Sequence, residues 1–346
     1  MRQKEEMAIQ EIDQMSITVL MDNYVDLLLS NSPYATRAPL IMNEKFKIPL
    51  PIAEHGFSAL VNIVKYDQKE NEKNSVDNST KSNNNLFLFD AGVCENGVVH
   101  NSDVFAIDFD QIKGIILSHG HFDHFTGLTN IIRKISSRRS GAVNLFVHPD
   151  AFLRRWLIFP GGKRVKMPFL DKMHLENIDL RIHQNTGVML LPKENSPLLL
   201  LTGEIPRDTS FEKGFPFQYV ENDNEKNLTP DPLVKDDQAL VANIRNKGLV
   251  VLTACGHSGI INTINYAKKV TGINQIYAIV GGFHLPADGG IHEEGIEPTL
   301  KELVKADPQF IVPCHCTGWK ATNRIIETFP KKFIQTGVGT TFNFNA

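Results

Sequence analysis

The sequence contains little cysteine and no long hydrophobic run. Its 346 residues include four cysteines, which are too few and too scattered for a disulfide scaffold: Cys94, Cys255, Cys314 and Cys316. No apolar stretch approaches the roughly 20 residues that a membrane-spanning helix requires. The first residues, MRQKEEMAIQ, are charged and lack the apolar core of a signal peptide. We therefore expect a cytoplasmic protein with reduced thiols.

The sequence also lacks an excess of charge of either sign. Lysine and arginine number 36 against 39 acidic residues, which gives a formal net charge of -3. Nucleic-acid binding requires a basic patch and usually an excess of positive charge, so the composition argues against a nuclease. With 42% hydrophobic and 22% charged residues, the chain can form one large core or two ordinary ones. We expect a globular protein with neither a nucleic-acid nor a membrane partner, and the oligomeric state stays open.

The most informative stretch is GIILSHGHFDHFTGL, residues 114–128. Its apolar residues 115–117 predict a short buried strand that ends at Ser118 and Gly120. Four potential metal ligands follow directly: His119, His121, Asp123 and His124. Imidazole and carboxylate groups are the ligands that zinc and similar transition metals take. A surface loop that holds three histidines by chance is the alternative, and it is disfavoured because histidine makes up only 12 of the 346 residues.

The spacing of these residues favours two metal ions. In an extended segment, residues two apart point the same way, so His119, His121 and Asp123 can converge while His124 faces differently. One cation would be held by His119 and His121, and its neighbour by Asp123 and His124. We predict two divalent ions, zinc first, with manganese, iron or magnesium as alternatives. They would polarise a phosphoryl or carbonyl oxygen and activate a water molecule that Asp123, in a catalytic role, orients.

Two later segments offer further ligands. Cys255 and His257 are two residues apart, so in an extended segment their side chains point the same way. We predict His257 as a metal ligand. Cys255 is either a thiolate ligand or an inert buried thiol. Neighbouring side chains of an extended segment point to opposite sides, so His315 cannot face the metals together with Cys314 and Cys316. Either His315 or the two thiols face them. We predict His315 as the ligand and the two thiols as packing groups.

Other residues are candidates for substrate binding or catalysis. His284, after two glycines, can serve as a proton donor, a phosphate contact or a metal ligand, and we predict a catalytic role. Arg207 beside Glu204 forms either a structural ion pair or an anion clamp over the substrate. Lys320 either holds an anionic substrate or is solvated at a helix start. His55 either lines the site or bonds a backbone carbonyl.

The motif at residues 119–124 resembles the H-x-H-x-D-H signature of the metallo-β-lactamase superfamily. A closer likeness, to the dihydropteridine-synthase-like branch of that superfamily, extends over residues 53–58 (AEHGFS), 201–207 (LTGEIPR), 236–240 (DDQAL), 252–263 (LTACGHSGIINT), 281–285 (GGFHL) and 313–321 (PCHCTGWKA). The resemblance implies an α/β fold, an αββα sandwich of two mixed β-sheets flanked by helices, with the metals at one sheet edge. It also implies that Asp90 orients a ligand imidazole, although a turn cap is an alternative. Cys255 stands near the place where many members carry a bridging aspartate.

The resemblance leaves three function classes open. Some members of the branch are assigned to joining a dihydropterin methyl diphosphate to a ribofuranosyl-aminobenzene phosphate, and others are described only as metal-dependent hydrolases. We predict a metal-dependent enzyme of hydrolase fold that acts on a small phosphorylated or pterin-like metabolite. The alternatives are the synthase reaction, which is a group transfer, and a non-catalytic metal-bound sensor or binding protein.

The domain organisation follows from composition. Residues 1–15 are predicted to be a mobile tail, and residues 16–346 a single metallo-β-lactamase-like domain that begins with a strand at 16–20. Residues 67–85 are polar, rich in asparagine and lysine, and without periodicity, which predicts a disordered hairpin insertion. Residues 156–169 are predicted to be a loop, as are residues 228–237. A final edge strand is expected at residues 340–344.

Overall fold

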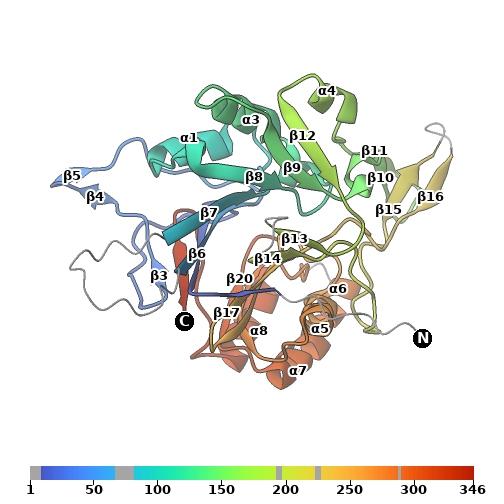
Figure 1. Cartoon of the computed structure of the whole chain (residues 1–346). Coiled ribbons are helices and arrows are strands. Elements are labelled where there is room, and N and C mark those ends of the chain that lie inside the picture. The colour runs from blue at the N-terminus through green and yellow to red at the C-terminus, as the bar shows by residue number, and fades with distance from the viewer. Residues whose placement is uncertain (1–8, 67–81, 192–196, 223–226, 287–289) are drawn as a thin grey trace.

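Two mixed β-sheets pack face to face, and helices cover the outer face of each (Figure 1). The computed structural model describes residues 9–66, 82–191, 197–222, 227–286 and 290–346. This arrangement confirms the predicted αββα sandwich. The layers explain the continuous apolar runs of the sequence, because central strands such as β18 (Gly248–Leu252) and β19 (Ile276–Gly281) are buried on one face by the partner sheet and on the other by helices.

The first sheet has eight strands in the order β12 (Leu180–Gln184), β9 (Val143–Val147), β8 (Ile112–Ile116), β7 (Ser82–Phe89), β6 (Ser58–Tyr66), β2 (Gln14–Met21), β21 (Thr341–Asn345) and β3 (Ala35–Thr36). Strands β7, β8, β9 and β12 run parallel, and the remaining pairs are antiparallel. The parallel connections pass through α1 (Gly97–Val104) and α3 (Leu128–Ser136). The predicted edge strand at 340–344 is β21, which lies between β2 and β3 and is therefore not at the edge.

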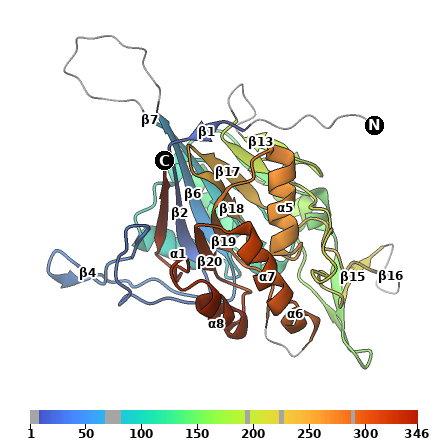
Figure 2. The same ribbon diagram turned by 90° about the horizontal axis from the view of Figure 1, so that it is seen from below.

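The second sheet has seven strands, ordered β13 (Met189–Leu191), β14 (Leu199–Leu201), β17 (Leu240–Ile244), β18 (Gly248–Leu252), β19 (Ile276–Gly281) and β20 (Phe310–Pro313), with β1 (Glu11–Ile12) paired to β17. Strands β18, β19 and β20 are parallel. The helices α5 (Ile260–Thr271) and α7 (Ile296–Ala306) connect them, and α8 (Trp319–Thr328) follows β20. Figure 2 shows these three helices side by side over the sheet.

The core is divided into three layers. A central cluster joins the facing sides of the sheets, for example Val61 of β6 and Val250 of β18. One outer cluster packs α3 on the first sheet, and the other packs α5, α7 and α8 on the second. Helix α3 shows why such helices form. Its buried residues recur at helical spacing, which gives one apolar face for the sheet: Leu128, Ile131, Ile132 and Ile135.

Smaller elements complete the described chain. A four-stranded sheet contains β11 (Arg164–Lys166), β10 (Arg155–Ile158), β15 (Gln218–Glu221) and β16 (Leu228–Pro230), and a small hairpin pairs β4 (Ile41–Met42) with β5 (Lys45–Phe46). The short helices are α2 (Phe122–Phe125), α4 (Lys172–Glu176), α6 (Ile291–Glu294), and the 3₁₀ turns η1 (Phe109–Gln111) and η2 (Pro149–Phe152). The loop predictions for residues 156–169 and 228–237 are wrong in part, because cross-strand pairs such as Trp156 with Tyr219 form this sheet. None of the described helices has both the length and the apolar character needed to cross a bilayer.

Parts of the predicted tail and of the predicted insertion belong to strands. Residues 11–15 belong to β1 and β2, and Ile12 and Met15 are fully buried in the central cluster, so the prediction of a mobile tail through residue 15 is wrong there. The sequence does not show these two residues as parts of strands, because polar residues surround them: Glu11, Asp13 and Gln14. Residues 82–85 belong to β7 rather than to the insertion. Residues 1–8 and 67–81 lie outside the described residues.

Candidate metal centre

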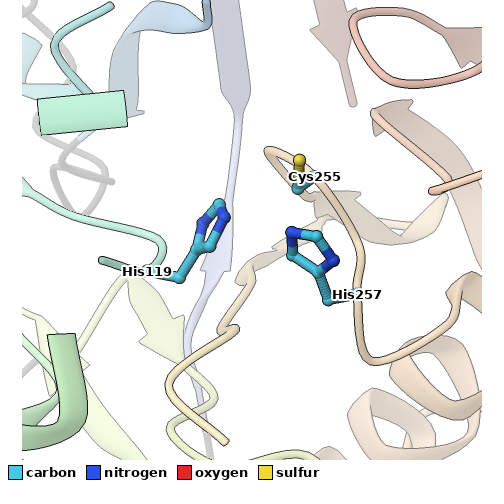
Figure 3. Close-up of side chains that lie close together, drawn as sticks. All are labelled: His119, Cys255 and His257. Atoms are coloured by element: carbon cyan, nitrogen blue, oxygen red, sulfur yellow. The ribbon is translucent and has the colours of Figure 1, made fainter. Parts of the chain in front are cut away.

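The candidate ligands follow three strand ends. His119 and His121 come after β8, with Asp123 and His124 on the short helix α2. Cys255 and His257 follow β18, and His315 follows β20. The structure thus brings together all of the predicted ligands, from both sheets. Figure 3 shows the side chains of His119, Cys255 and His257 facing one space.

The ligand atoms form two groups that share one thiol. One ligand atom from each of His119, Cys255 and His257 lies within 4.8 Å of the others. The same holds for His124, Cys255 and His315, and all five residues are buried. Cys255 therefore lies between two histidine pairs, which is where a bridging ligand would stand. Burial, together with the neighbouring Cys316 thiol, raises the pKa of Cys255 well above its usual value.

Asp123 joins the second group. Its Oδ2 atom lies 3.6 Å from Nε2 of His124 and 3.5 Å from Nε2 of His315. Burial alone would raise the pKa of Asp123, but these imidazoles hold it well below its usual range. His55, with a side chain that is 69% exposed, lies 3.7 Å from the same oxygen. The centre is therefore open to solvent on the side of His55.

Asp90 fixes the orientation of two histidines. Its Oδ2 atom lies 2.7 Å from Nδ1 of His124 and accepts a 2.7 Å hydrogen bond from Oγ of Ser118. Because this hydroxyl donates to Asp90, it accepts from Nδ1 of His119, 2.8 Å away. In the neutral rings, both Nε2 atoms are then free of hydrogen and available to a metal. The orienting role predicted for Asp90 is confirmed for His124.

The donor set fits a divalent metal. Buried ring nitrogens of His119, His124, His257 and His315 have no hydrogen-bond partner within the described residues. Unpaired buried nitrogens cost free energy unless a ligand satisfies them. Burial and then the neighbouring imidazoles lower the pKa of His119 and of His257 well below the usual value, so the rings are neutral, as metal ligands must be. Nitrogen, sulfur and carboxylate oxygen together suit zinc or a similar transition metal.

His121 is held by an amide. Its Nε2 atom lies 2.5 Å from Oε1 of Gln218, whose Nε2 donates to Asp231 at 2.9 Å. That second bond sets the amide so that its oxygen accepts from His121, which leaves Nδ1 of the ring for a metal. The ring centroid lies 4.5 Å from that of His119 and 4.6 Å from that of His257. His121 thus lies beside the first group.

Arg155 and Asp236 support the first ligand loop, and the sequence does not predict either. Both are buried, and the guanidinium donates to the carboxylate at 2.5 and 3.1 Å. Oδ2 of Asp236 also accepts from the backbone N–H of Gly120 at 2.7 Å, between the first two histidines. The pair is separated by 81 residues, so no local pattern could reveal it.

The next two residues extend this support to the second loop. Asp237 accepts a 2.7 Å hydrogen bond from the backbone N–H of Ser258, which follows His257. Gln238 donates its side-chain amide to the carbonyl of Leu117 at 2.8 Å. Residues 236–238 therefore tie together the ends of β8 and β18. The resemblance includes this segment, but its residue types carry no metal-binding signal of their own.

Three predicted substrate-binding residues make no bond or ion pair with the candidate ligands in the described part of the chain. Lys320 pairs with Glu293 on the surface. Arg207 donates to the backbone carbonyls of Ile205 and Leu233 rather than pairing with Glu204. Glu204 itself is exposed, with its backbone N–H bonded to Thr186. Arg207 thus acts as a brace between two loops.

The thiols of Cys314 and Cys316 differ in position. Cys314 packs in the central apolar cluster. Sγ of Cys316 donates to the carbonyl of Cys255 at 2.9 Å, and one ligand atom each of Cys255, His284 and Cys316 lie within 4.8 Å of one another. The prediction that both thiols only pack does not anticipate this position of Cys316. The alternation that it assumes fails because His315 has a positive φ of 49°.

Comparison with known proteins agrees with this geometry. A family model described as the metallo-beta-lactamase superfamily matches residues 81–153, which include the histidine motif. A protein of Methanocaldococcus jannaschii, 7,8-dihydropterin-6-methyl-4-(beta-D-ribofuranosyl)-aminobenzene-5'-phosphate synthase, is 27% identical over 341 residues, 98% of this chain and 99% of the relative. A second protein of that archaeon, described as uncharacterized, is 30% identical over 277 residues, 79% of this chain and 88% of the relative. The chain belongs to the metallo-β-lactamase superfamily.

A solved structure of this superfamily shares the fold along the whole chain. It is described as a metal-dependent hydrolase of the β-lactamase superfamily, and it is 22% identical, with a TM-score of 0.67. The match covers 96% of this chain and 100% of the other. The predicted resemblance to the superfamily and to its dihydropteridine-synthase-like branch is thus confirmed, and the fold is that of the metallo-β-lactamases.

Proposed function

We propose that this protein is a metal-dependent enzyme that acts on a small phosphorylated, pterin-like metabolite, and that it transfers the pterinylmethyl group from diphosphate to an aminobenzene partner rather than to water. The observation that carries the proposal is the paired ligand cluster around Cys255, in a chain similar over 98% of its length to a dihydropterin-dependent synthase. A sensor that only binds metal would not need a solvent-open side such as the one at His55.

Two divalent ions, zinc first, would be held by seven side chains. His119, His121 and His257 would hold one, and Asp123, His124 and His315 the other, with Cys255 between them. Bound there, the ions would supply Lewis acidity toward phosphate or carbonyl oxygen. A thiolate in place of a bridging carboxylate favours zinc or iron over magnesium, because sulfur is a soft ligand.

The residues of the chain prepare the site in three ways. Asp90 holds His124, and Ser118 holds His119, in the tautomer that turns Nε2 inward. Asp123 has a low pKa and therefore stays ionised at neutral pH, which suits orienting a nucleophile better than accepting its proton. His55 lies at the open side, where its exposed ring can contact an incoming substrate.

Transfer and hydrolysis share one bond-breaking event. In both, the bond from the pterin methylene carbon to a diphosphate oxygen breaks and diphosphate leaves. In transfer, the amino nitrogen of the aminobenzene attacks the methylene carbon, a carbon–nitrogen bond forms and that nitrogen loses a proton. In hydrolysis, water attacks instead. The buried ligand cluster is common to both, so the nucleophile that the enzyme admits distinguishes them.

The test is a substrate panel with the zinc, manganese and iron forms of the protein. It contains a dihydropterin methyl diphosphate with and without a ribofuranosyl-aminobenzene phosphate, a phosphodiester, a lactone and a thioester. We expect diphosphate release that depends on the aminobenzene partner, and its loss in His119→Ala but not in a control with an exposed histidine replaced, His174→Ala. Hydrolysis of a simple ester or diester without turnover of the pterin pair would contradict the transferase.

A further inference from the structure

A cavity of about 310 Å³ lies beside the loop that carries His315. Three segments line it: residues 22–24 after β2, residues 313–326 from the end of β20 into α8, and residues 333–336. Its aromatic lining comes from Tyr24, Trp319 and Phe333. This volume falls at the lower end of the range for small-molecule sites, which are mostly apolar with a few placed polar groups.

The cavity wall is hydrogen-bonded to His315. The backbone N–H of His315 donates to Oδ1 of Asp22 at 3.0 Å, and its carbonyl accepts from the side-chain amide of Asn23 at 2.7 Å. The ring of the same histidine lies 3.5 Å from Asp123. One residue thus contributes its backbone to the cavity and its imidazole to the candidate metal centre.

The same wall borders the open side of the metal centre. The carbonyl of Asp22 accepts from the backbone N–H of Glu54 at 3.1 Å, directly before the exposed His55. The ring of His55 lies 5.3 Å from that of His315 and stacks on it. A molecule held in the cavity would therefore be one loop away from the solvent-open side of Asp123.

Asp22 supplies a buried carboxyl group to the cavity lining. It is 1% exposed, and its Oδ1 accepts from the backbone N–H groups of both Asn23 and His315. No hydrogen bond to Oδ2 is found within the described residues. A buried carboxylate oxygen with spare capacity selects ligands that offer N–H donors and repels anions. Aromatic walls select flat rings.

We propose that this cavity binds the planar nitrogen heterocycle of the substrate, a dihydropterin ring, with an N–H of the ring donated to Oδ2 of Asp22 and the ring face packed against Trp319 or Tyr24. The substituent on the ring would then extend past His315 toward the metal centre. This assignment rests on the proposed function, and it names Asp22 and Trp319 as specificity residues.

The two tryptophans of the chain allow a direct test. In Trp156→Phe, Trp319 is the sole tryptophan, and it is 71% exposed at the start of α8. We expect 6-hydroxymethyl-7,8-dihydropterin to quench its emission saturably in the zinc-loaded protein. Calorimetric titration should show binding weakened by about tenfold or more in Asp22→Asn and in Trp319→Leu, since each removes one recognition element. Phe46→Ala, which removes an exposed aromatic ring on β5, is the matched control.

The outcomes separate this proposal from the proposed function. Equal affinity in the wild type and both variants, or no binding of the dihydropterin at all, overturns the cavity assignment. If the pterin pair is nevertheless turned over, the function stands and the ring binds elsewhere. Binding that depends on Asp22 and Trp319 without turnover of the pair supports the cavity and contradicts the transferase. Because Asp22 also holds His315, thermal melting checks that Asp22→Asn is folded, and Trp319→Leu tests the site without touching that bond.

Discussion

The Nδ1 atom of His124 lies 2.7 Å from Oδ2 of Asp90, and both side chains are fully buried. Burial alone would lower the pKa of His124, but Asp123 and Asp90 together raise it. The carboxylate therefore keeps a proton on Nδ1 and directs Nε2 toward the cluster. The geometry of the second ligand group therefore depends on a residue that lies outside that group.

Replacement of Asp90 should weaken metal binding. In Asp90→Asn the amide can still occupy the space, but it loses an acceptor for His124 or for Ser118. Removal of such supporting groups typically lowers metal affinity by roughly 10- to 100-fold. Competition with a chromophoric chelator measures this, with the exposed Asp103→Asn as control. Unchanged affinity would show that packing alone orients His124.

The buried pair of Arg155 and Asp236 should be critical for stability. Arg155→Met leaves a buried carboxylate without its partner, so we expect the free energy of unfolding to fall by about 3–5 kcal/mol. Its neighbour Arg154 is half exposed and lies 3.8 Å from Glu221, so Arg154→Met should cost less than about 1 kcal/mol. Urea denaturation of both variants gives the comparison. Equal losses would mean that the buried pair is no more important than the surface pair.

The thiol of Cys255 should bind metal directly. In cobalt-substituted protein, a thiolate ligand produces a charge-transfer absorption band, which we expect to disappear in Cys255→Ser and to persist in Cys314→Ser. Metal analysis should show a drop from about two ions per chain toward one, since the shared ligand is lost. A band that survives in Cys255→Ser would assign the thiolate to Cys316 instead.

Glu212 should make stability depend on pH. It accepts hydrogen bonds from the backbone N–H groups of Ile261 and Asn262 at the start of α5, yet burial raises its pKa from 4.5 to about 7. The folded state thus binds this proton more tightly than the unfolded state. The resulting stabilisation is complete below pH 4.5 and is lost as the pH rises to about 7, at most about 3 kcal/mol.

The measurement compares wild type with Glu212→Gln by urea denaturation near pH 5 and near pH 8. The wild type should lose about 3 kcal/mol relative to the variant over that interval. Glu176→Gln, at an exposed carboxylate of α4, controls for the charge change. A constant difference between wild type and Glu212→Gln would show that Glu212 is ionised at both pH values.

Much of the ligand set could be predicted from the sequence because it is local. His119 to His124 lie on one loop and the start of one helix, and their spacing alone suggests two metals. His257 and His315 also follow predictable apolar strands. The sheets themselves follow from apolar runs, and the turn between β17 and β18 contains Asn246 and Gly248, residue types that are typical of turns.

The features of the site that the sequence does not predict are those that depend on tertiary contacts. The bond from Gln218 to His121 joins residues that are 97 positions apart, and neither residue predicts the other. Parity arguments assume extended backbone, so they misplace Cys316 once His315 adopts a left-handed conformation. The bonds of Arg207 are not predictable for another reason. A basic residue near a site suggests an anionic ligand, but this side chain donates to backbone carbonyl groups.

The segment 236–238 has a consequence for protein synthesis. During synthesis, the histidine loop that follows β8 leaves the ribosome well before Asp236, because Gly120 and the carboxylate that accepts its N–H are 116 residues apart. Until then, the loop carries four ligands but lacks the bond that sets their geometry and the partner histidines that close the cluster. Metal insertion should therefore follow folding of the second sheet. A growing chain stalled before residue 236 would hold metal only weakly.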